Sequence, residues 1–252
     1  MKKLSYALVL LMFTVSIVAQ ESTMKQKFIE ETRIEAPVFI GVVDSDKTSQ
    51  QTFSQHLQQE LAYLSELDYL YDEGVVAVDF IVEKDGSVSN LSISNSVSKT
   101  IDEAVLRVIS QSNHMWQAGK INGATSSMDK TVFVKFDIPG NDSHNELAAN
   151  YLQIAIKQLY AINTIESKYV NEDKILRKSQ RKTNSAENYL LKAEQYKPND
   201  LSITFWQART YELQGKNDLK QQMLDKYLEL TRHDVIEKSL TDDVLFAVIT
   251  LD

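Results

Sequence analysis

The chain has no cysteine among its 252 residues. This absence excludes disulfide bonds, thiolate metal ligands, a cysteine nucleophile and a lipid-modified amino-terminal cysteine, so core packing alone must stabilise the fold. Glycine and proline are also scarce, at seven and three residues. Because a β-sandwich with many turns needs more of both, the composition favours helices with a minority of strands.

Positive charge is in the minority, with 27 lysines and arginines against 35 aspartates and glutamates, and the formal net charge is −8. An acidic surface gives no support to binding of nucleic acid, and we expect no such partner. The hydrophobic content of 43% is enough to form a core. The length suits one large domain or two modest ones.

Signatures of catalytic and metal sites are missing from the sequence. None of the four histidines lies within four residues of another, so there is no zinc-protease pair. These histidines are His56, His114, His144 and His233. The sequence also has neither a Gly-x-Ser-x-Gly elbow nor a phosphate-binding glycine loop. We therefore expect a protein that is not an enzyme, with no catalytic residue, metal ligand or cofactor.

The amino terminus has the three parts of a secretory leader. Two lysines precede an apolar run from about Ala7 to Val18, and the small residue Ala19 ends the segment. The run is shorter than the roughly 20 apolar residues that span a bilayer. Residues 1–19 are thus predicted to be a signal peptide, with residues 20–35 as a short linker. The alternative is an uncleaved membrane anchor.

Residues 72–97 have the pattern of two strands joined by a tight turn. Four apolar side chains alternate along the first strand: Val76, Val78, Phe80 and Val82. Asp85-Gly86 supplies the turn, since glycine readily adopts the positive φ that such turns require. The alternation shifts in the return strand, which predicts a β-bulge near Ser89-Asn90.

A third strand and two helices complete the pattern. Residues 131–138 alternate again, with Phe133 and Lys135 facing away from the core. Two amphipathic stripes predict one helix before the hairpin and one after it. The stripes are Phe53, Leu57, Leu61 and Leu64, and Ile101, Ala104, Val105, Val108 and Ile109. The order of elements predicts an α+β fold, a small three-stranded antiparallel sheet with both helices on one face.

At residues 36–139 the sequence resembles the C-terminal domain of the TonB family. The resemblance rests on segments that follow in order: EGVVAVDFIVEKDGSVSNLSI, IDEAVLRVI, MWQAGKINGA and VFVKFDIPG. It implies a periplasmic domain that grips a short extended segment of an outer-membrane TonB-dependent receptor. Within such a small domain, we expect Trp116 to close the end of the core rather than to bind a ligand.

Residues 139–143, PGNDS, mark a boundary, and residues 144–252 are predicted to be helical. The segment around Pro198 and Gly215 resembles a degenerate tetratricopeptide repeat, with helices on both sides of a Pro-Asn-Asp turn. Only about one and a half repeats are visible, whereas such arrays usually need three or more. This helical tail must therefore pack against the helix before it, the first domain or a second chain, so a homodimer is one possibility.

The predicted binding site is the edge of the sheet. Because the segments after residues 131–138 are predicted to be helical, this strand is expected to lie at an edge of the sheet, where an extended peptide can pair with its backbone. The residues of this peptide-binding edge are Val132, Phe133, Val134, Lys135 and Phe136. Phe133 and Lys135 are expected to select the neighbouring side chains of the peptide.

Two functions remain open. In the first, the protein is a periplasmic binding module that captures an extended receptor segment by strand addition, while the helical tail docks another protein. In the second, an uncleaved amino terminus anchors it to the periplasmic side of the inner membrane, and it is an energy-transducer component of outer-membrane transport. The mass of the mature amino terminus separates the two.

Overall fold

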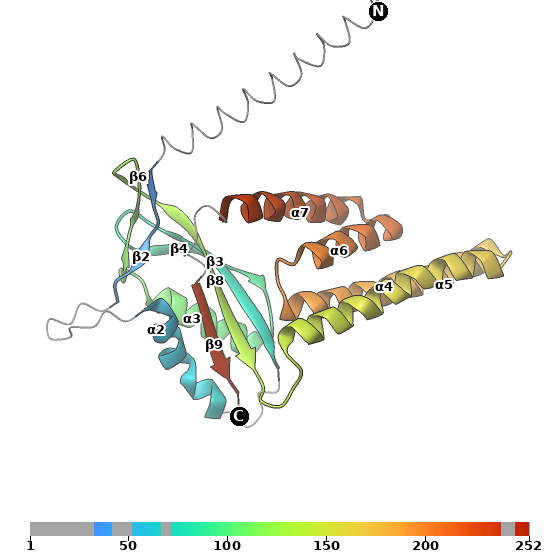
Figure 1. Cartoon of the computed structure of the whole chain (residues 1–252), viewed down its shortest axis with the longest axis horizontal. Helices are drawn as coiled ribbons and strands as arrows, with labels where there is room; N and C mark the ends of the chain where they lie inside the picture. The colour runs from blue at the N-terminus through green and yellow to red at the C-terminus, as the bar shows by residue number, and fades with distance from the viewer. Residues whose placement is uncertain (1–32, 42–51, 67–71, 238–244, 252) are drawn as a thin grey trace, which may run out of the picture.

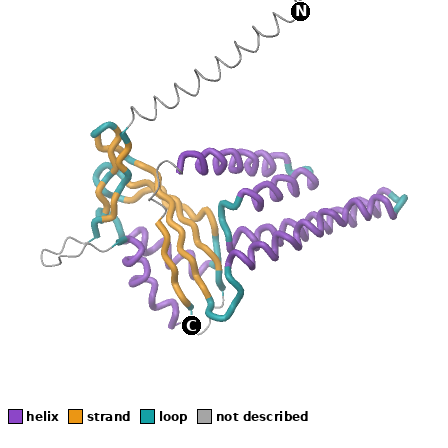
Figure 2. The backbone as a smooth tube through the Cα atoms, in the orientation of Figure 1, coloured by secondary structure: helices purple, strands orange, loops and turns teal. Residues whose placement is uncertain are grey.

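The computed structural model describes residues 33–41, 52–66, 72–237 and 245–251, and the predicted signal peptide lies outside these ranges. A sheet occupies the middle of the molecule, with two helices on one side and a long helical region on another (Figure 1). Small sheets lie beside one end of the main sheet (Figure 2). In one of them β6 (Gly119–Ile121) lies between β1 (Ile34–Glu35) and β7 (Ala124–Ser126), and in the other β2 (Val38–Phe39) pairs with β5 (Trp116–Gln117). The end of the predicted linker is thus a strand.

The predicted hairpin is present as β3 (Gly74–Val82) and β4 (Val88–Asn95). Gly86 has φ of +79°, and a Cβ added there would lie 2.2 Å from the carbonyl oxygen of Trp116. The turn therefore requires glycine at this position. The predicted bulge is also confirmed, because Asp79 pairs with Ser92 whereas Ile81 pairs with Ser89, which leaves one extra residue in β4.

The main sheet has four strands, in the order β4-β3-β8-β9. The third predicted strand is β8 (Met128–Asp137), antiparallel to β3. The fourth, β9 (Leu245–Thr250), pairs with β8 in parallel. The prediction of a three-stranded sheet was therefore one strand short. The missed strand has the sequence LFAVIT, a short apolar run that periodicity alone does not distinguish from a buried helix.

Two helices cover one face of this sheet, as predicted: α2 (Phe53–Leu61), with a 3₁₀ turn at Ala62–Glu66, and α3 (Lys99–Gln111). Both predicted stripes are buried, and they pack on Val76, Val78, Phe80 and Val82 of β3 and on Val132, Val134 and Phe136 of β8. Trp116 is 3% exposed, its Nε1 donates to Ser112 Oγ at 3.0 Å, and its ring lies against Phe39, Phe53 and Phe80. It is the core residue that the sequence predicted.

The helical region consists of α4 (His144–Lys168), α5 (Glu172–Tyr196), α6 (Leu201–Gln214) and α7 (Asn217–Glu237). The expected turn lies between α5 and α6, where Asp200 caps α6, and Gly215 ends α6 with φ of +72°. A second core joins α4, α5 and α6 through residues such as Leu159, Leu190 and Ile203. Among the residues that the structure describes, none of these helices combines the length and apolar character needed to cross a bilayer.

The four helices form the connection between β8 and β9. Parallel neighbouring strands cannot be joined by a tight turn and need a long crossover, which here is the whole helical region. This differs from the predicted division into consecutive domains at residues 36–139 and 144–252. The chain does leave the sheet at residues 139–143, but its last described strand returns to it.

The helical region also packs directly on the start of β3. The side chain of Gln195, near the end of α5, donates a 2.9 Å hydrogen bond to the carbonyl oxygen of Glu73. A Cβ on Gly74 would lie 2.9 Å from Gln195 Cγ, so glycine permits this close approach. The helical tail therefore packs against its preceding helix and the sheet, two of the three options open from the sequence.

Candidate functional site

The predicted peptide-binding edge lies inside the sheet rather than at its margin. β8 pairs with β3 on one side and with β9 on the other, and residues 132–136 of β8 are in register with residues 245–249 of β9. The prediction that β8 is an edge strand is therefore wrong. The prediction failed because more than a hundred residues, mostly helical, separate β8 from β9 in the chain. Local sequence patterns do not indicate a pairing between strands so far apart.

β9 is docked through its side chains as well as its backbone. Ala247, Ile249 and Leu251 are at most 4% exposed and belong to the same core as the helices on that face. On the outer margin of β9, the side chain of Gln58 in α2 donates a 3.3 Å hydrogen bond to the carbonyl oxygen of Val248. The place beside β8 is thus fully occupied by the chain itself, and the opposite margin of the sheet is β4.

The two side chains expected to select a ligand lie on the other face of β8. Phe133 is half-buried, whereas Val132, Val134 and Phe136 are fully buried on the helix-covered face. Lys135 forms an ion pair, with its Nζ 2.9 Å from Asp137 Oδ2. An acidic ligand would have to compete with Asp137 for this lysine.

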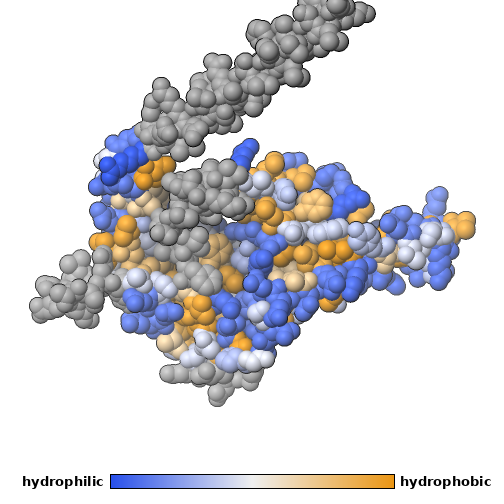
Figure 3. Space-filling model, viewed as in Figure 1, coloured by the Kyte–Doolittle hydropathy of each residue, from blue (hydrophilic) through white to orange (hydrophobic). Residues whose placement is uncertain are grey.

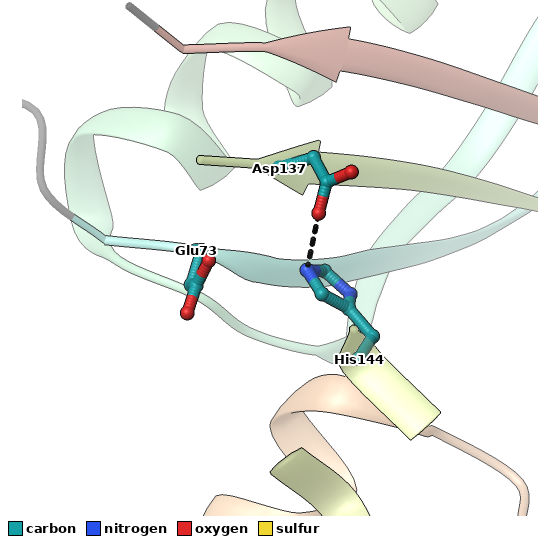
Figure 4. Close-up of side chains that lie close together, drawn as sticks. All are labelled: Glu73, Asp137 and His144. Atoms are coloured by element: carbon teal, nitrogen blue, oxygen red, sulfur yellow. Dashed lines mark ion pairs between the residues drawn. The ribbon is translucent and has the colours of Figure 1, made fainter. Parts of the chain in front are cut away.

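A cluster of three ionisable side chains lies where the sheet meets the helical region (Figure 4). Glu73 immediately precedes β3, Asp137 ends β8 and His144 begins α4. One ligand atom from each residue lies within 4.8 Å of those of the other two, and His144 Nε2 is 3.4 Å from Asp137 Oδ1. Glu73 and His144 are only 7% and 6% exposed. Three elements therefore place two carboxylates and an imidazole around one point.

The surroundings of the cluster shift the pKa of His144 and that of the neighbouring Tyr196. Burial lowers the pKa of His144, and Lys135 acts in the same direction, whereas Asp137 and Glu73 oppose the shift. The ring of Tyr196 lies edge-on to the ring of His144 with the centroids 5.3 Å apart. Burial, followed by the charge of Glu73, raises the pKa of Tyr196 to about 12. Burial therefore favours the neutral form of the His144 imidazole and the protonated form of the Tyr196 hydroxyl.

The sequence did not predict this cluster, since no metal site was expected. The sequence indicates that these residues are neighbours only once the pairing of β3 with β8 is known. Gly74 pairs with Phe136, so the antiparallel register places Glu73 opposite Asp137. His144 reaches the pair because the connection from β8 to α4 is short. Residues separated by 64 positions in the chain become neighbours through this register.

Comparison with known protein families gives a match for one part of the chain. Residues 59–138 match a family model. Its description is Gram-negative bacterial TonB protein C-terminal. The match covers about a third of the chain, from the end of α2 to the end of β8, and leaves out β9 and the helices α4–α7. The searches of curated proteins and of solved structures found no significant match.

Proposed function

We propose that this protein is an exported TonB-like binding module that captures an extended segment of an outer-membrane TonB-dependent receptor by strand addition. The TonB C-terminal match supports a role in outer-membrane transport. Such a role is one of binding and not of catalysis, and its setting is the periplasm. Strand addition suits this fold, because main-chain pairing supplies affinity while alternate side chains supply specificity.

The single observation that carries the mechanism is the parallel pairing of β9 with β8. A six-residue segment, supplied from beyond a long crossover, lies where an added strand would lie. We infer that the receptor segment replaces β9 at residues 132–136 of β8. Because Ala247, Ile249 and Leu251 fill the core face, the incoming segment needs small or apolar residues at alternate positions. β9 then competes with the receptor for one position.

The test compares the full chain with a variant that lacks residues 245–252. Both are isotope-labelled and titrated with a peptide from the amino-terminal extension of an outer-membrane receptor of the same cell. Removal of the competing strand should tighten binding by roughly tenfold or more, since the free protein no longer forms the competing pairing. The amide shifts should cluster at residues 131–138. A peptide of the same composition with its alternation destroyed is the control.

Equal affinity for the two proteins, or amide shifts confined to β4, would contradict replacement of β9. Shifts confined to β4 would instead indicate that the ligand uses the margin that the chain leaves uncovered. Circular dichroism of the truncated variant establishes that it is folded before the titration. If it is not folded, increasing concentrations of a free peptide with the sequence of residues 245–252 should compete with the receptor peptide on the full chain.

The helical tail is proposed as a second protein-docking surface. Figure 3 shows hydrophobic residues among hydrophilic ones over α6 and α7. Phe205 and Leu228 are 49% and 53% exposed on these helices. The first occupant to test is a second copy of the chain, by analytical ultracentrifugation of the wild type and of Leu228→Glu. Dimers that Leu228→Glu abolishes would support a homodimer, and monomers in both would exclude it.

A further inference from the structure

Two members of the cluster, Glu73 and His144, are buried and have unsatisfied polar atoms, whereas the side chain of Asp137 is 38% exposed. Within the described part of the chain, both ring nitrogens of His144 and Oε2 of Glu73 are buried and form no hydrogen bond, and His144 Nε2 lies 3.4 Å from the charged atom Asp137 Oδ1. Buried polar groups nearly always have a partner, because losing water without replacement costs free energy. Two carboxylates close together add mutual repulsion. Lys135 offsets part of this charge through Asp137 Oδ2, and the remaining polar atoms of the cluster are ones that a cation could satisfy.

We propose that Glu73, Asp137 and His144 bind one divalent first-row transition metal ion, of the class of Zn²⁺, with one ligand atom from each side chain. Imidazole nitrogen and carboxylate oxygen are both zinc ligands, at about 2.0–2.2 Å. Three protein ligands leave a fourth position of a tetrahedron for water.

The distances fit such an ion after a small closure. Two ligand atoms of a tetrahedral zinc site are about 3.4 Å apart, given metal–ligand bonds of about 2.1 Å. His144 Nε2 and Asp137 Oδ1 already have this separation, at 3.4 Å. All three ligand atoms lie within 4.8 Å of one another, so rotation of the Glu73 side chain is the main adjustment. Figure 4 shows the Asp137 carboxylate directed at the His144 ring, with the Glu73 carboxylate to one side of this pair.

Neighbouring residues are arranged to support these ligands. Asp137 uses Oδ2 for Lys135, which leaves Oδ1 for the metal. The ring of Tyr196 packs edge-on against the ring of His144 and also stacks on the ring of Tyr151, with the latter two centroids 5.8 Å apart. Partners of this kind hold ligands in orientation and commonly change metal affinity when mutated.

The donor set also predicts selectivity. Mg²⁺ and Ca²⁺ prefer shells made of oxygen alone, and a site with an imidazole favours transition metals. The ligands come from β3, β8 and α4, which meet only in the folded chain. A bound ion would therefore stabilise the native state and fasten the helical region to the sheet.

The test uses the purified protein, freed of metal with a chelator and titrated with Zn²⁺ by calorimetry. We expect one Zn²⁺ per chain and a rise in the melting temperature, with no effect of Mg²⁺. Glu73→Gln and His144→Gln should each weaken Zn²⁺ binding by roughly tenfold or more. The matched control is His114→Asn, which removes an exposed histidine and keeps a residue that tolerates its positive φ of 62°.

X-ray absorption of the zinc complex should show one imidazole among nitrogen and oxygen ligands. Absence of saturable binding, or an unchanged affinity in Glu73→Gln and His144→Gln, would overturn the proposal. If His144→Gln does not fold without metal, Glu73→Gln decides, because it keeps the shape of the side chain. If only His114→Asn lost Zn²⁺ binding, the ion would bind elsewhere in the protein, and this result would also overturn the proposal.

Discussion

The backbone amide of Leu251 donates a 2.8 Å hydrogen bond to the carbonyl oxygen of Asp137. This bond continues the β8–β9 pairing beyond Thr250, and the Leu251 side chain is only 2% exposed. The last described residue is therefore part of the sheet and its core. Any ligand that adds to β8 must first displace this contact and those of β9.

Replacing Ile249 with alanine measures how firmly β9 is docked. Ile249 is 4% exposed in the main core, so Ile249→Ala should lower the free energy of unfolding by about 2–4 kcal/mol. Urea denaturation gives this value. Its neighbour Val248 is 37% exposed, and Val248→Ala should change the free energy by about 0.5 kcal/mol or less. Similar small effects of both substitutions would mean that β9 is not a core strand.

Gly86→Ala tests the turn of the hairpin against a matched glycine. Both Gly86 and Gly123 have positive φ, but only at Gly86 would a Cβ overlap the backbone of Trp116. Around Gly123 no described atom lies within 4 Å of the added Cβ. Gly86→Ala should therefore destabilise the protein by about 1–3 kcal/mol more than Gly123→Ala, as judged by thermal or urea unfolding. Equal costs would show that only backbone strain matters there.

Acid should destabilise the fold through His56. Burial lowers the pKa of His56 below its ordinary value, and Glu60 opposes this shift. The folded protein therefore binds fewer protons than the unfolded chain, so stability is complete at neutral pH and falls as the pH drops below about 6.5. The fall ends once the pH is below the folded pKa. Urea unfolding at pH 7.5 and 5.5 should show a smaller loss in His56→Gln than in the wild type.

For this comparison His114→Asn is the control, because His114 is exposed. It should leave the loss between the two pH values unchanged. A loss that is identical in the wild type and in His56→Gln would assign the acid sensitivity to other groups.

The amino terminus of the mature protein distinguishes the two functions. We expect cleavage after Ala19 and a soluble periplasmic protein that begins near Gln20. Mass spectrometry of the protein from periplasmic and membrane fractions measures both properties. An intact leader in the inner-membrane fraction would instead favour an anchored energy transducer.

Local pattern in the sequence was sufficient for most elements of the fold. The alternation of Val76, Val78 and Phe80, the turn at Gly86 and the stripe that includes Leu57 each depend on residues close together in the chain. Strand and helix periods, turn chemistry and capping are properties of such short segments. The structure confirms these elements, and the TonB C-terminal match covers most of the same residues.

Only the tertiary structure decided which segments became neighbours. The segment LFAVIT is short and mostly apolar, so its sequence alone does not distinguish a strand from a buried helix. Its partner β8 is separated from it in the chain by four helices. The sequence positions of Glu73, Asp137 and His144 do not match the spacing of a metal-binding motif. These residues are neighbours because of the β3–β8 register and the position of the start of α4. Pairings across long sequence distances depend on the free energy of the whole fold, which no local pattern contains.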